Sequence, residues 1–144
     1  MTQAIIAYGS LVERSQDGTT YEPIPEVKGV AVPQVEQEYV EATHLQSPNG
    51  FREYIKGLKD AGELTIPANY TTEGYEQQLD DQAFNGSIFY RVTLPLAPGQ
   101  TTTGDRFEFK GYPNPALETG DVGEIIAMNI TIRTTGDFTF TAGS

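Results

Sequence analysis

The last quarter of the chain constrains the fold most strongly, because it has the pattern of one long strand that is buried on one side. From Ile125 to Arg133 the residues are β-branched or apolar nearly throughout. Side chains alternate between the two faces of a strand, so the even positions share one face. These positions hold Ile126, Met128, Ile130 and Ile132. The odd positions form a half-polar face, and we therefore predict a long central strand within a sheet.

A turn signal, Thr-Thr-Gly-Asp, follows this strand at residues 134–137, and Phe138 and Phe140 then resume the even phase. This pattern predicts a β-hairpin. A hairpin alone is only marginally stable in water. The rest of the chain must therefore supply the surface that covers its apolar face.

The composition favours a single domain of residues 1–144 with many short strands. Of the 144 residues 38% are hydrophobic, and there are 15 Gly and 9 Pro. This length is typical of one domain with one core, and the abundant turn formers favour short strands. No apolar run approaches the roughly 20 residues that cross a bilayer, so we expect no membrane partner. There is no Cys, which excludes disulfides and thiolate metal sites.

Two strands are predicted near the N-terminus. Residues 11–15 form the first, Asp17-Gly18 is a turn signal, and residues 20–30 form the second. Pro23 and Pro25 lack amide donors, so the second strand is expected at a sheet edge.

The segment 46–62 is the least typical part of the chain. It follows a predicted strand at residues 37–45 and is interrupted by Pro48-Asn49-Gly50, Gly57 and Gly62. We predict a long loop there, and long loops in compact domains are usually functional. The segment carries four apolar side chains: Phe51, Tyr54, Ile55 and Leu58. Three of them (Phe51, Ile55 and Leu58) are spaced as on one helical turn. Either the four form a local cluster, or they contact another protein.

One helix is predicted, at residues 73–84. Thr72 is placed to cap it, and an apolar stripe at i, i+4 and i+8 is expected to be buried while the opposite side faces water. The stripe consists of Tyr75, Leu79 and Ala83. The side expected to face solvent consists of Gln77, Asp80 and Asp81.

Further strands are predicted around this helix, at residues 63–70, 87–94 and 105–112, from their alternating pattern. Thr-Gly-Asp recurs at 103–105, 119–121 and 135–137, at turns before strands. We interpret this spacing as an antiparallel meander. The predicted fold class is mainly β: a two-sheet β-sandwich or open barrel with one flanking helix.

The side chains that catalysis needs are scarce, and we predict no enzyme, no cofactor and no metal site. His44 is the only imidazole, without a plausible Ser or Cys partner nearby in sequence. Carboxylates are plentiful, so a pair acting on glycosides stays open, but no pair lies in an apolar setting that would raise one pKa. Twenty acidic against nine basic residues give a net charge of -11. Ordinary binding to nucleic acid is disfavoured because the phosphate backbone is also negative.

At this point a resemblance to a known family becomes visible. The segment YVEATHLQSPNGFREYIKGLKDAGELTIPANY at residues 39–70, the helix TTEGYEQQLDDQAF, and the later segments DRFEFKGYP and DVGEIIAMNITIRTTG resemble the major tail tube protein of long non-contractile-tailed bacteriophages. The similarity runs from about residue 9 to residue 140. Its most specific block lies at residues 41–64, and the family is related to the tube protein of type VI secretion systems.

The resemblance implies a structural virion protein of the phage tail, made in the host cytoplasm. Six copies are expected to form a ring, and stacked rings a tube through which genomic DNA passes without specific binding. Expected partners are other copies of the chain and, by the same resemblance, the tape measure, tail terminator and tail-tip proteins. Some relatives add a C-terminal immunoglobulin-like domain, which we do not expect here.

The residues suggest how such an assembly would work. Unpaired strand edges can be paired by identical neighbours in a closed ring. Six copies carry 6 × (-11) = -66 charges, and an acidic lumen repels DNA phosphates. The lumen-lining candidates, which could equally be ordinary solvated positions, are Glu36, Glu38, Glu41 and Glu63. The candidates for contacts between subunits lie in the predicted long loop: Phe51, Arg52, Tyr54, Ile55 and Leu58.

Two other classes of function stay open on sequence grounds. A monomeric β-sandwich that binds carbohydrate needs exposed aromatic rings on a sheet face, and Tyr70, Tyr90 and Tyr112 are the candidates. An enzyme that uses carboxylates is the third class.

Overall fold

A computed structural model describes residues 8–118 and 120–144. The elements in this part of the chain are β1 (Leu11–Ser15), β2 (Glu22–Pro23), β3 (Glu36–Glu41), the 3-10 helix η1 (Pro48–Gly50), β4 (Tyr54–Asp60), β5 (Glu63–Asn69), α1 (Thr72–Ala83), β6 (Ile88–Thr93), β7 (Arg106–Leu117) and β8 (Ala127–Thr141). The predicted mainly β fold with one α-helix is confirmed. None of the described helical segments is both long and apolar enough to cross a membrane.

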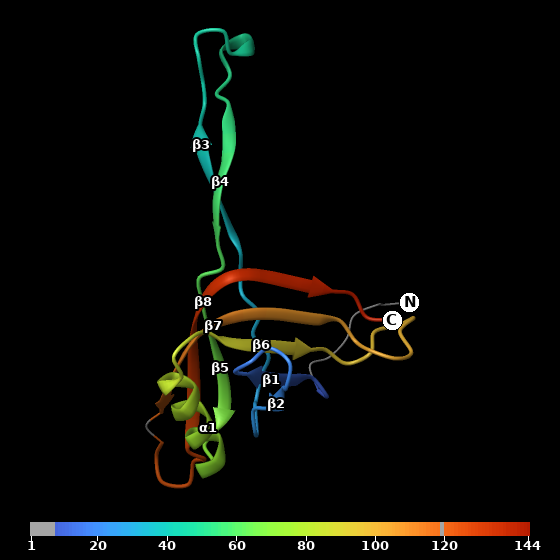
Figure 1. The fold of residues 1–144 in the computed structure, drawn as a ribbon, viewed down its shortest axis with the longest axis vertical. Helices are drawn as coiled ribbons and strands as arrows, with labels where there is room; N and C mark the ends of the chain where they lie inside the picture. The colour runs from blue at the N-terminus through green and yellow to red at the C-terminus, as the bar shows by residue number, and fades with distance from the viewer. Residues whose placement is uncertain (1–7, 119) are drawn as a thin grey trace.

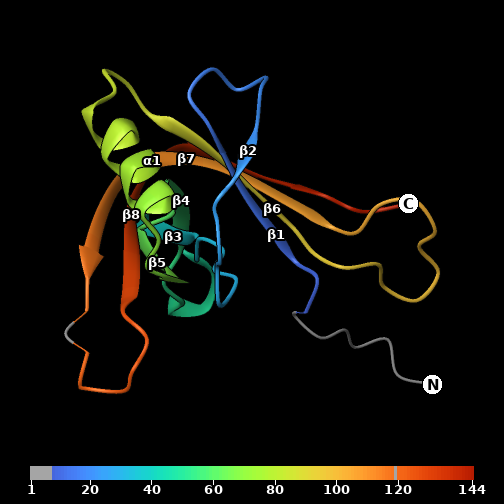
Figure 2. The same cartoon turned by 90° about the horizontal axis from the view of Figure 1, so that it is seen from below.

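The body of the molecule is a six-stranded sheet in the order β2-β1-β6-β7-β8-β5, and every neighbouring pair is antiparallel. The sheet is curled into a half-barrel (Figures 1 and 2). Strands β6, β7 and β8 are consecutive neighbours, which confirms the predicted meander. The second sheet contains only β3 and β4 and projects away from the body (Figure 1). The open-barrel form of the prediction is therefore the one observed.

The predicted hairpin at residues 134–137 is wrong, because β8 continues through this segment to Thr141. Phe109 pairs with Phe138 and Lys110 with Thr135, so Gly136 and Asp137 form a bulge in β8. Gly136 has φ of 74°, which glycine adopts readily, and a bulge bends a strand. The residues favour a turn locally, but pairing with β7 keeps this segment within one continuous strand.

The bend in β8 is matched by close packing in β7. A Cβ atom at Gly111 would collide with Ile132 and with the carbonyl of Arg133, so the absence of a side chain lets the two strands approach. Figure 1 shows β8 turning sharply at this level of the body. The curl of the half-barrel therefore depends on Gly111 and on the bulge at Gly136.

The core lies on one face of this sheet and follows the predicted alternation. Met128, Ile130 and Ile132 of β8 are fully buried. Partners from four other strands and one connecting segment complete the cluster: Val12, Ile24, Leu64, Ile66, Ala68, Ile88, Tyr90, Val92 and Phe109. The central-strand prediction is thus confirmed for positions 128–132, whereas Ile126 lies before β8 and is half exposed.

The helix α1 has nearly the predicted bounds but buries a different side. Thr71 caps it, since its hydroxyl accepts a hydrogen bond from the amide of Gly74 over 3.0 Å, so the predicted cap at Thr72 is off by one residue. The buried positions are Gly74, Gln78 and Asp81, while Leu79 and Ala83 are exposed. The placement of Asp81 in water is therefore also wrong; an ion pair with the sheet, described below, draws this side of the helix inward.

A short segment after β1 connects the two edges of the half-barrel. The predicted strand at 20–30 is reduced to β2, which pairs with β1 at the sheet edge as expected. The chain then crosses to the opposite edge, where Val27 forms an antiparallel bridge with Ala68 of β5. The amide of Lys28 donates to the carbonyl of Pro67 over 2.8 Å, and the amide of Asn69 donates to the carbonyl of Glu26 over 2.9 Å. This segment therefore covers part of the β5 edge.

The predicted loop at 46–62 is instead mostly strand. Residues 54–60 form β4, which pairs antiparallel with β3, and the chain between them forms the tip of a long hairpin. We call this projecting segment, residues 36–60, the arm (Figure 1). The helical spacing of Phe51, Ile55 and Leu58 is coincidental. Both faces of the arm lack a covering layer within the chain, so no alternation of apolar and polar residues marked its strands.

Candidate functional site

The arm is the most exposed apolar feature of the molecule. The exposed fractions of Phe51, Tyr54, Ile55 and Leu58 are 71%, 55%, 59% and 79%. Tyr39 and Val40, on the opposite strand, are also more than half exposed. Large exposed apolar surface on a projecting element is typical of a contact site for another protein. These side chains do not form a local cluster of their own, which excludes that alternative.

The strand register divides the arm into two faces with different chemistry. Directly opposed residues in an antiparallel pair lie on the same face. Val40 is opposite Ile55, and Glu36 is opposite Asp60. A Cβ atom at Gly57 would lie 3.3 Å from the Cβ of Glu38 and 3.5 Å from Val40, which puts Glu38 on this face too. We call this side the acidic face; it consists of Glu36, Glu38, Val40, Ile55 and Asp60.

The other side of the arm carries two lysines and two aromatic rings. Tyr39 is opposite Lys56, and Glu41 is opposite Tyr54. Lys59 is opposite Gln37, which shares the alternation of Tyr39. We call this side the basic face; its members are Gln37, Tyr39, Glu41, Tyr54, Lys56 and Lys59. Glu41 lies 3.9 Å from the guanidinium of Arg52, so its charge is partly compensated.

Polar contacts order the tip of the arm. The carboxylate of Glu53 accepts a hydrogen bond from the Ser47 hydroxyl over 2.8 Å and lies 3.2 Å from Nε2 of His44. The amide of Glu53 donates to the Thr43 hydroxyl over 2.9 Å. His44, the only imidazole, therefore has a structural partner at an exposed tip. The Ser47 hydroxyl, the nearest in sequence, is directed to Glu53 and not to the imidazole.

The structure separates the four lumen-lining candidates. Glu36 and Glu38 share the acidic face of the arm, Glu41 lies on the basic face, and Glu63 lies on β5 in the body. Glu63 is exposed and stands opposite Arg133 of β8. The five candidates for contacts between subunits, in contrast, all lie on the arm or its tip.

The open face of the six-stranded sheet, opposite the core, carries charges of both signs. Glu13 accepts a hydrogen bond from Arg91 over 2.9 Å, and Arg91 also stacks 3.9 Å from the centre of the Tyr21 ring. Strand alternation assigns seven charged side chains to this face: Glu13, Glu63, Arg91, Arg106, Glu108, Lys110 and Arg133. This face is therefore balanced in charge, which the overall charge of -11 did not indicate.

A free strand edge runs beside the foot of the arm. Strand β5 pairs with residues 127–133 of β8, and β7 pairs with β8 along its whole length. In the described part of the chain, residues 135–141 of β8 thus have a strand partner on one side only. Such an edge presents backbone amides and carbonyls that a strand of another chain can pair.

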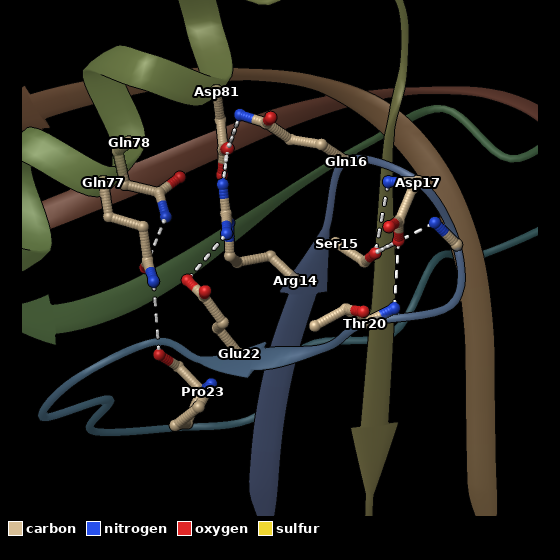
Figure 3. Close-up of polar contacts among 11 residues, drawn as sticks. Arg14, Ser15, Gln16, Asp17, Thr20, Glu22, Pro23, Gln77, Gln78 and Asp81 are labelled. Carbon is tan, nitrogen blue, oxygen red and sulfur yellow. Dashed lines mark hydrogen bonds and ion pairs between the residues drawn. The ribbon is translucent and has the colours of Figure 1, made fainter.

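A buried ion pair fastens the helix to the sheet (Figure 3). The guanidinium of Arg14, on the core side of β1, donates from Nε to the Asp81 carboxylate over 2.7 Å and makes a second contact with it through a terminal nitrogen. Asp81 is 1% exposed and Arg14 is 8% exposed. The hydrogen bond that Arg14 donates to Asp81 raises the pKa of Arg14, so the guanidinium stays protonated. Gln16 and Glu22 extend the network to the β1–β2 turn.

Two other titratable side chains, Tyr90 and Asp17, lie close to this pair. Burial raises the pKa of Tyr90, so its hydroxyl stays protonated, and that hydroxyl has no hydrogen-bond partner within the described residues. Asp17, in the adjacent turn, has a pKa lowered by hydrogen bonds from the amides of Thr20 and Thr19 and from the Ser15 hydroxyl. No group of three or more His, Asp or Glu in residues 8–118 and 120–144 is placed to hold a metal ion.

The three tyrosines considered for carbohydrate binding do not form a platform. Tyr90 is fully buried and stacks on Phe109 with 5.5 Å between ring centres. Tyr70 packs against Tyr75 of α1 at 5.8 Å. Only Tyr112 is substantially exposed, at 49%. The geometry therefore argues against this alternative.

Sequence reasoning missed Lys56, Lys59 and the β8 edge. The strand predicted at residues 37–45 corresponds to β3, at residues 36–41, but the bulge between Gln37 and Tyr39 in the β3–β4 register makes the faces of β4 hard to predict without the pairing. The edge of β8 depends on where β5 stops, which is a property of the assembled sheet.

Comparisons with known proteins identify the fold. No protein-family model matches the sequence. No curated protein matches it either. Among solved structures, a chain in the six-fold symmetrised cryo-EM structure of the anti-feeding prophage (AFP) baseplate has a TM-score of 0.71 at 10% identity, covering 99% of this chain and 98% of that chain.

Two further similar structures come from an extracellular contractile injection system, PVC, in the extended state. A chain of its sheath/tube terminator structure has a TM-score of 0.69 at 12% identity, covering 96% of this chain and 97% of that chain. A chain of its sheath–tube complex has a TM-score of 0.68 at 12% identity, covering 96% and 92%. Over at least 96% of its length the chain thus shares its fold with chains of a prophage baseplate and of a contractile injection system.

Proposed function

We propose that this protein is a structural subunit of a phage tail or tail-like particle, in which six copies form a ring and rings stack into a tube. The observation that carries the proposal is the fold match over nearly the whole length of chains from a six-fold symmetrised baseplate and from a sheath–tube complex. Two of the similar structures belong to a contractile injection system, whereas the sequence resembles tube proteins of long non-contractile tails. We propose the latter as the particle type.

The body supplies the means to close a ring. Within the described residues, residues 135–141 of β8 have a strand partner on one side only, and the short edge strand β2 pairs with Glu13 and Arg14 of β1 alone. A closed ring of identical copies pairs such edges without leaving a free one. The curled half-barrel would then contribute a segment of a continuous wall.

The arm supplies the apolar contacts. The arm extends beyond the body (Figure 1). Its exposed side chains are Phe51, Tyr54, Ile55 and Leu58, with Arg52 beside them. Buried aromatic and aliphatic anchors dominate the binding energy of interfaces. We propose that the arm packs on other copies of the chain, and that the finished tube contacts tape measure, terminator and tip proteins.

The tube would conduct DNA without binding it. Six copies carry 6 × (-11) = -66 charges, so a duplex would meet a repulsive field and slide. The candidates for the acidic lining remain Glu36, Glu38, Glu41 and Glu63. Only Glu63 lies on the sheet that would form the wall, and the open face of that sheet is balanced in charge, so the arm glutamates carry most of this part of the proposal.

Native mass spectrometry and negative-stain electron microscopy of the purified chain test the proposed function. The chain has a mass of 15.8 kDa, so a ring of six has 6 × 15.8 = about 95 kDa. We expect this species or open-bored tubes at high protein concentration, with no binding of duplex DNA at physiological salt. A chain that stays monomeric at every concentration, even after seeding with preformed tail tips, would contradict the proposal.

A further inference from the structure

A hollow lies at the foot of the arm, beside the edge of β8 described above. Its volume is about 440 Å³, and its lining residues are Val35, Lys59, Ala61, Gly136, Asp137 and Phe138. The walls therefore come from both ends of the arm and from the bulge in β8. Val35 and Phe138 give the hollow an apolar part, and neither side chain is fully buried. A partly apolar hollow beside such a strand edge is suited to a protruding segment of another chain.

The connection between β7 and β8 provides a protruding apolar segment. We call residues 120–126 the loop tip. The amide of Glu124 donates a hydrogen bond to the carbonyl of Asp121 over 3.0 Å, so the tip contains a tight turn. Val122 is fully exposed, and Ile125 is 74% exposed. The loop tip thus presents two aliphatic side chains together with two carboxylates.

The loop tip and the hollow lie at opposite ends of the body. Figure 1 shows the arm projecting from one end and the connection between β7 and β8 at the other. Nine residues of β8 separate Ala127, where the strand begins, from Gly136 in the wall of the hollow, which is about 30 Å of extended chain. The two features therefore cannot meet within one chain. A protrusion that fits a hollow elsewhere on the same molecule makes a head-to-tail contact, which generates rings when the rotation closes.

We propose that the loop tip of each copy occupies the hollow at the foot of the arm of the next copy in the ring. This inference rests on the proposed ring. It names the partner of both surfaces, a second copy of this chain. Val122 and Ile125 would cover the apolar part of the hollow, and the carboxylates of the tip would face Lys59.

The charges of the two surfaces support this pairing. The loop tip carries Asp121 and Glu124, while Lys59 lines the hollow and Lys56 follows it on the basic face of the arm. The ion pairs formed among the described residues include none of these four side chains. Asp137, the one carboxylate of the hollow, belongs to β8, so the acids of the tip would turn toward the arm. Contact between two loop tips would instead oppose like charges, which is destabilising.

The contact leaves the bore open. Neighbours in the ring are related by one sixth of a turn, so equivalent atoms of neighbours are as far from each other as from the axis. When the tip of one copy meets the hollow of the next, the separation of tip and hollow within one chain sets that distance. At equal height along the axis, the contact then lies about 30 Å from the axis. The arm continues along the body of the next copy and does not enter the bore.

Cysteine cross-linking tests the pairing directly, because the chain has no native Cys. The variant with both substitutions, Ala61→Cys and Val122→Cys, places one thiol in the hollow and one on the loop tip. Treatment of assembled rings with a short bismaleimide should give a ladder of cross-linked copies that ends at six. Each single variant should stay uncross-linked, because neither surface meets its own copy.

The outcomes separate this inference from the proposed function. Rings or tubes without a ladder would overturn the pairing and leave the ring intact. A ladder that continues past six copies in tubes would also overturn it, because it would place the contact between rings. Dimers from either single variant would overturn it as well. Wild-type protein that stays monomeric at every concentration would reject the proposed function, and this inference with it.

Charge reversal gives a second, independent readout. Lys59→Glu places a carboxylate opposite those of the loop tip and should raise the protein concentration needed for ring formation by about tenfold or more. Adding Glu124→Lys to that variant should return the concentration toward the wild-type value. The matched control is Lys28→Glu, an exposed position outside both surfaces, which should assemble as the wild type does. Equal effects of Lys59→Glu and Lys28→Glu, or no rescue by Glu124→Lys, would overturn the pairing.

Discussion

The body and the arm are both built from antiparallel strands, yet the body buries its apolar side chains and the arm exposes them. In the body, β8 buries Met128, Ile130 and Ile132 against the rest of the sheet. In the arm, β4 leaves Tyr54, Ile55 and Leu58 exposed on a two-stranded ribbon. A lone two-stranded hairpin is marginally stable in water. The body thus buries its apolar side chains within one chain, whereas the arm leaves its own exposed.

Under the proposed function, contacts within the body stabilise the fold and contacts of the arm drive assembly. Substitutions in the body should change the free energy of unfolding, because its side chains contact one another within the chain. Substitutions in the arm should change association and leave that free energy nearly constant. Four predictions, taken from the largest expected effect on stability to the smallest, probe this contrast.

The largest loss is expected from Asp81→Ala. The substitution leaves the Arg14 guanidinium buried without its carboxylate, and breaking a buried ion pair from one side costs about 3 to 5 kcal/mol. Urea unfolding followed by circular dichroism measures the change. The neighbouring Asp80→Ala serves as the matched control, because Asp80 is exposed and should shift stability by no more than about 0.5 kcal/mol. Equal effects of the two substitutions would show that the pair does not fasten the helix.

A similar loss is expected from Ile130→Ala in the centre of β8. Ile130 is fully buried, and truncating a buried Ile to Ala costs about 2 to 5 kcal/mol through lost burial and the cavity left behind. The matched control in the arm, Ile55→Ala, should cost no more than about 0.5 kcal/mol in the monomer. If both substitutions destabilise the monomer equally, the arm packs against something within its own chain.

A smaller effect concerns acid stability and involves two turns of the body. Hydrogen bonds from backbone amides lower the pKa of Asp17 and of Asp105 in the folded chain. The folded state therefore gains stability above the unfolded pKa of 3.8, and this gain is lost as the pH falls below that value. We expect Asp17→Asn to reduce the dependence of the unfolding midpoint on pH in this acidic range.

Asp105→Asn supplies the comparison for that experiment. Its partners, the amide of Gly143 at 2.9 Å and the side chain of Gln100 at 2.8 Å, are separate from those of Asp17. The two substitutions should therefore act additively. An unchanged pH dependence in both variants would show that these turns do not contribute to acid stability.

The smallest effect on folding is expected from Ile55→Asp, which should leave a folded monomer with near wild-type stability. It should nevertheless abolish tubes, because a carboxylate would be buried in an apolar contact between copies. Circular dichroism and negative-stain microscopy of the same sample measure both properties. Intact tubes would remove Ile55 from the contact.

Much of the body could be predicted from the sequence because each strand there has one buried, apolar face. Residues 63–69 and the central part of β8 were located by alternation, and residues 11–15 by the turn signal that follows them. The helix was located by its cap signal and its apolar stripe, but the cap lies one residue earlier and the stripe is not its buried side. The sequence has no sign that Asp81 pairs with Arg14, which is 67 residues away.

The arm and the end of β8 could not be predicted for the opposite reason. The strand pattern of β4 is obscured because neither of its faces is covered, and Gly57 with the nearby bulge breaks its phase. At Gly136 the local preference for a turn was correctly read, but pairing of Phe138 with Phe109 outweighed it. The residues of a segment set which backbone conformations it can adopt. Pairing with residues far away in the sequence decides which of these conformations it does adopt.

The sequence by itself determined a mainly β chain, its acidic charge, its single helix and the dry face of its central strand. It could do so because charge is additive and because burial on one side leaves a period of two in the residues. Only the tertiary structure decided that residues 36–60 project as an arm with two unlike faces, that β8 bends without turning back, and that an edge stays open. Those features depend on register and on contacts between residues far apart in the chain, which no local pattern records.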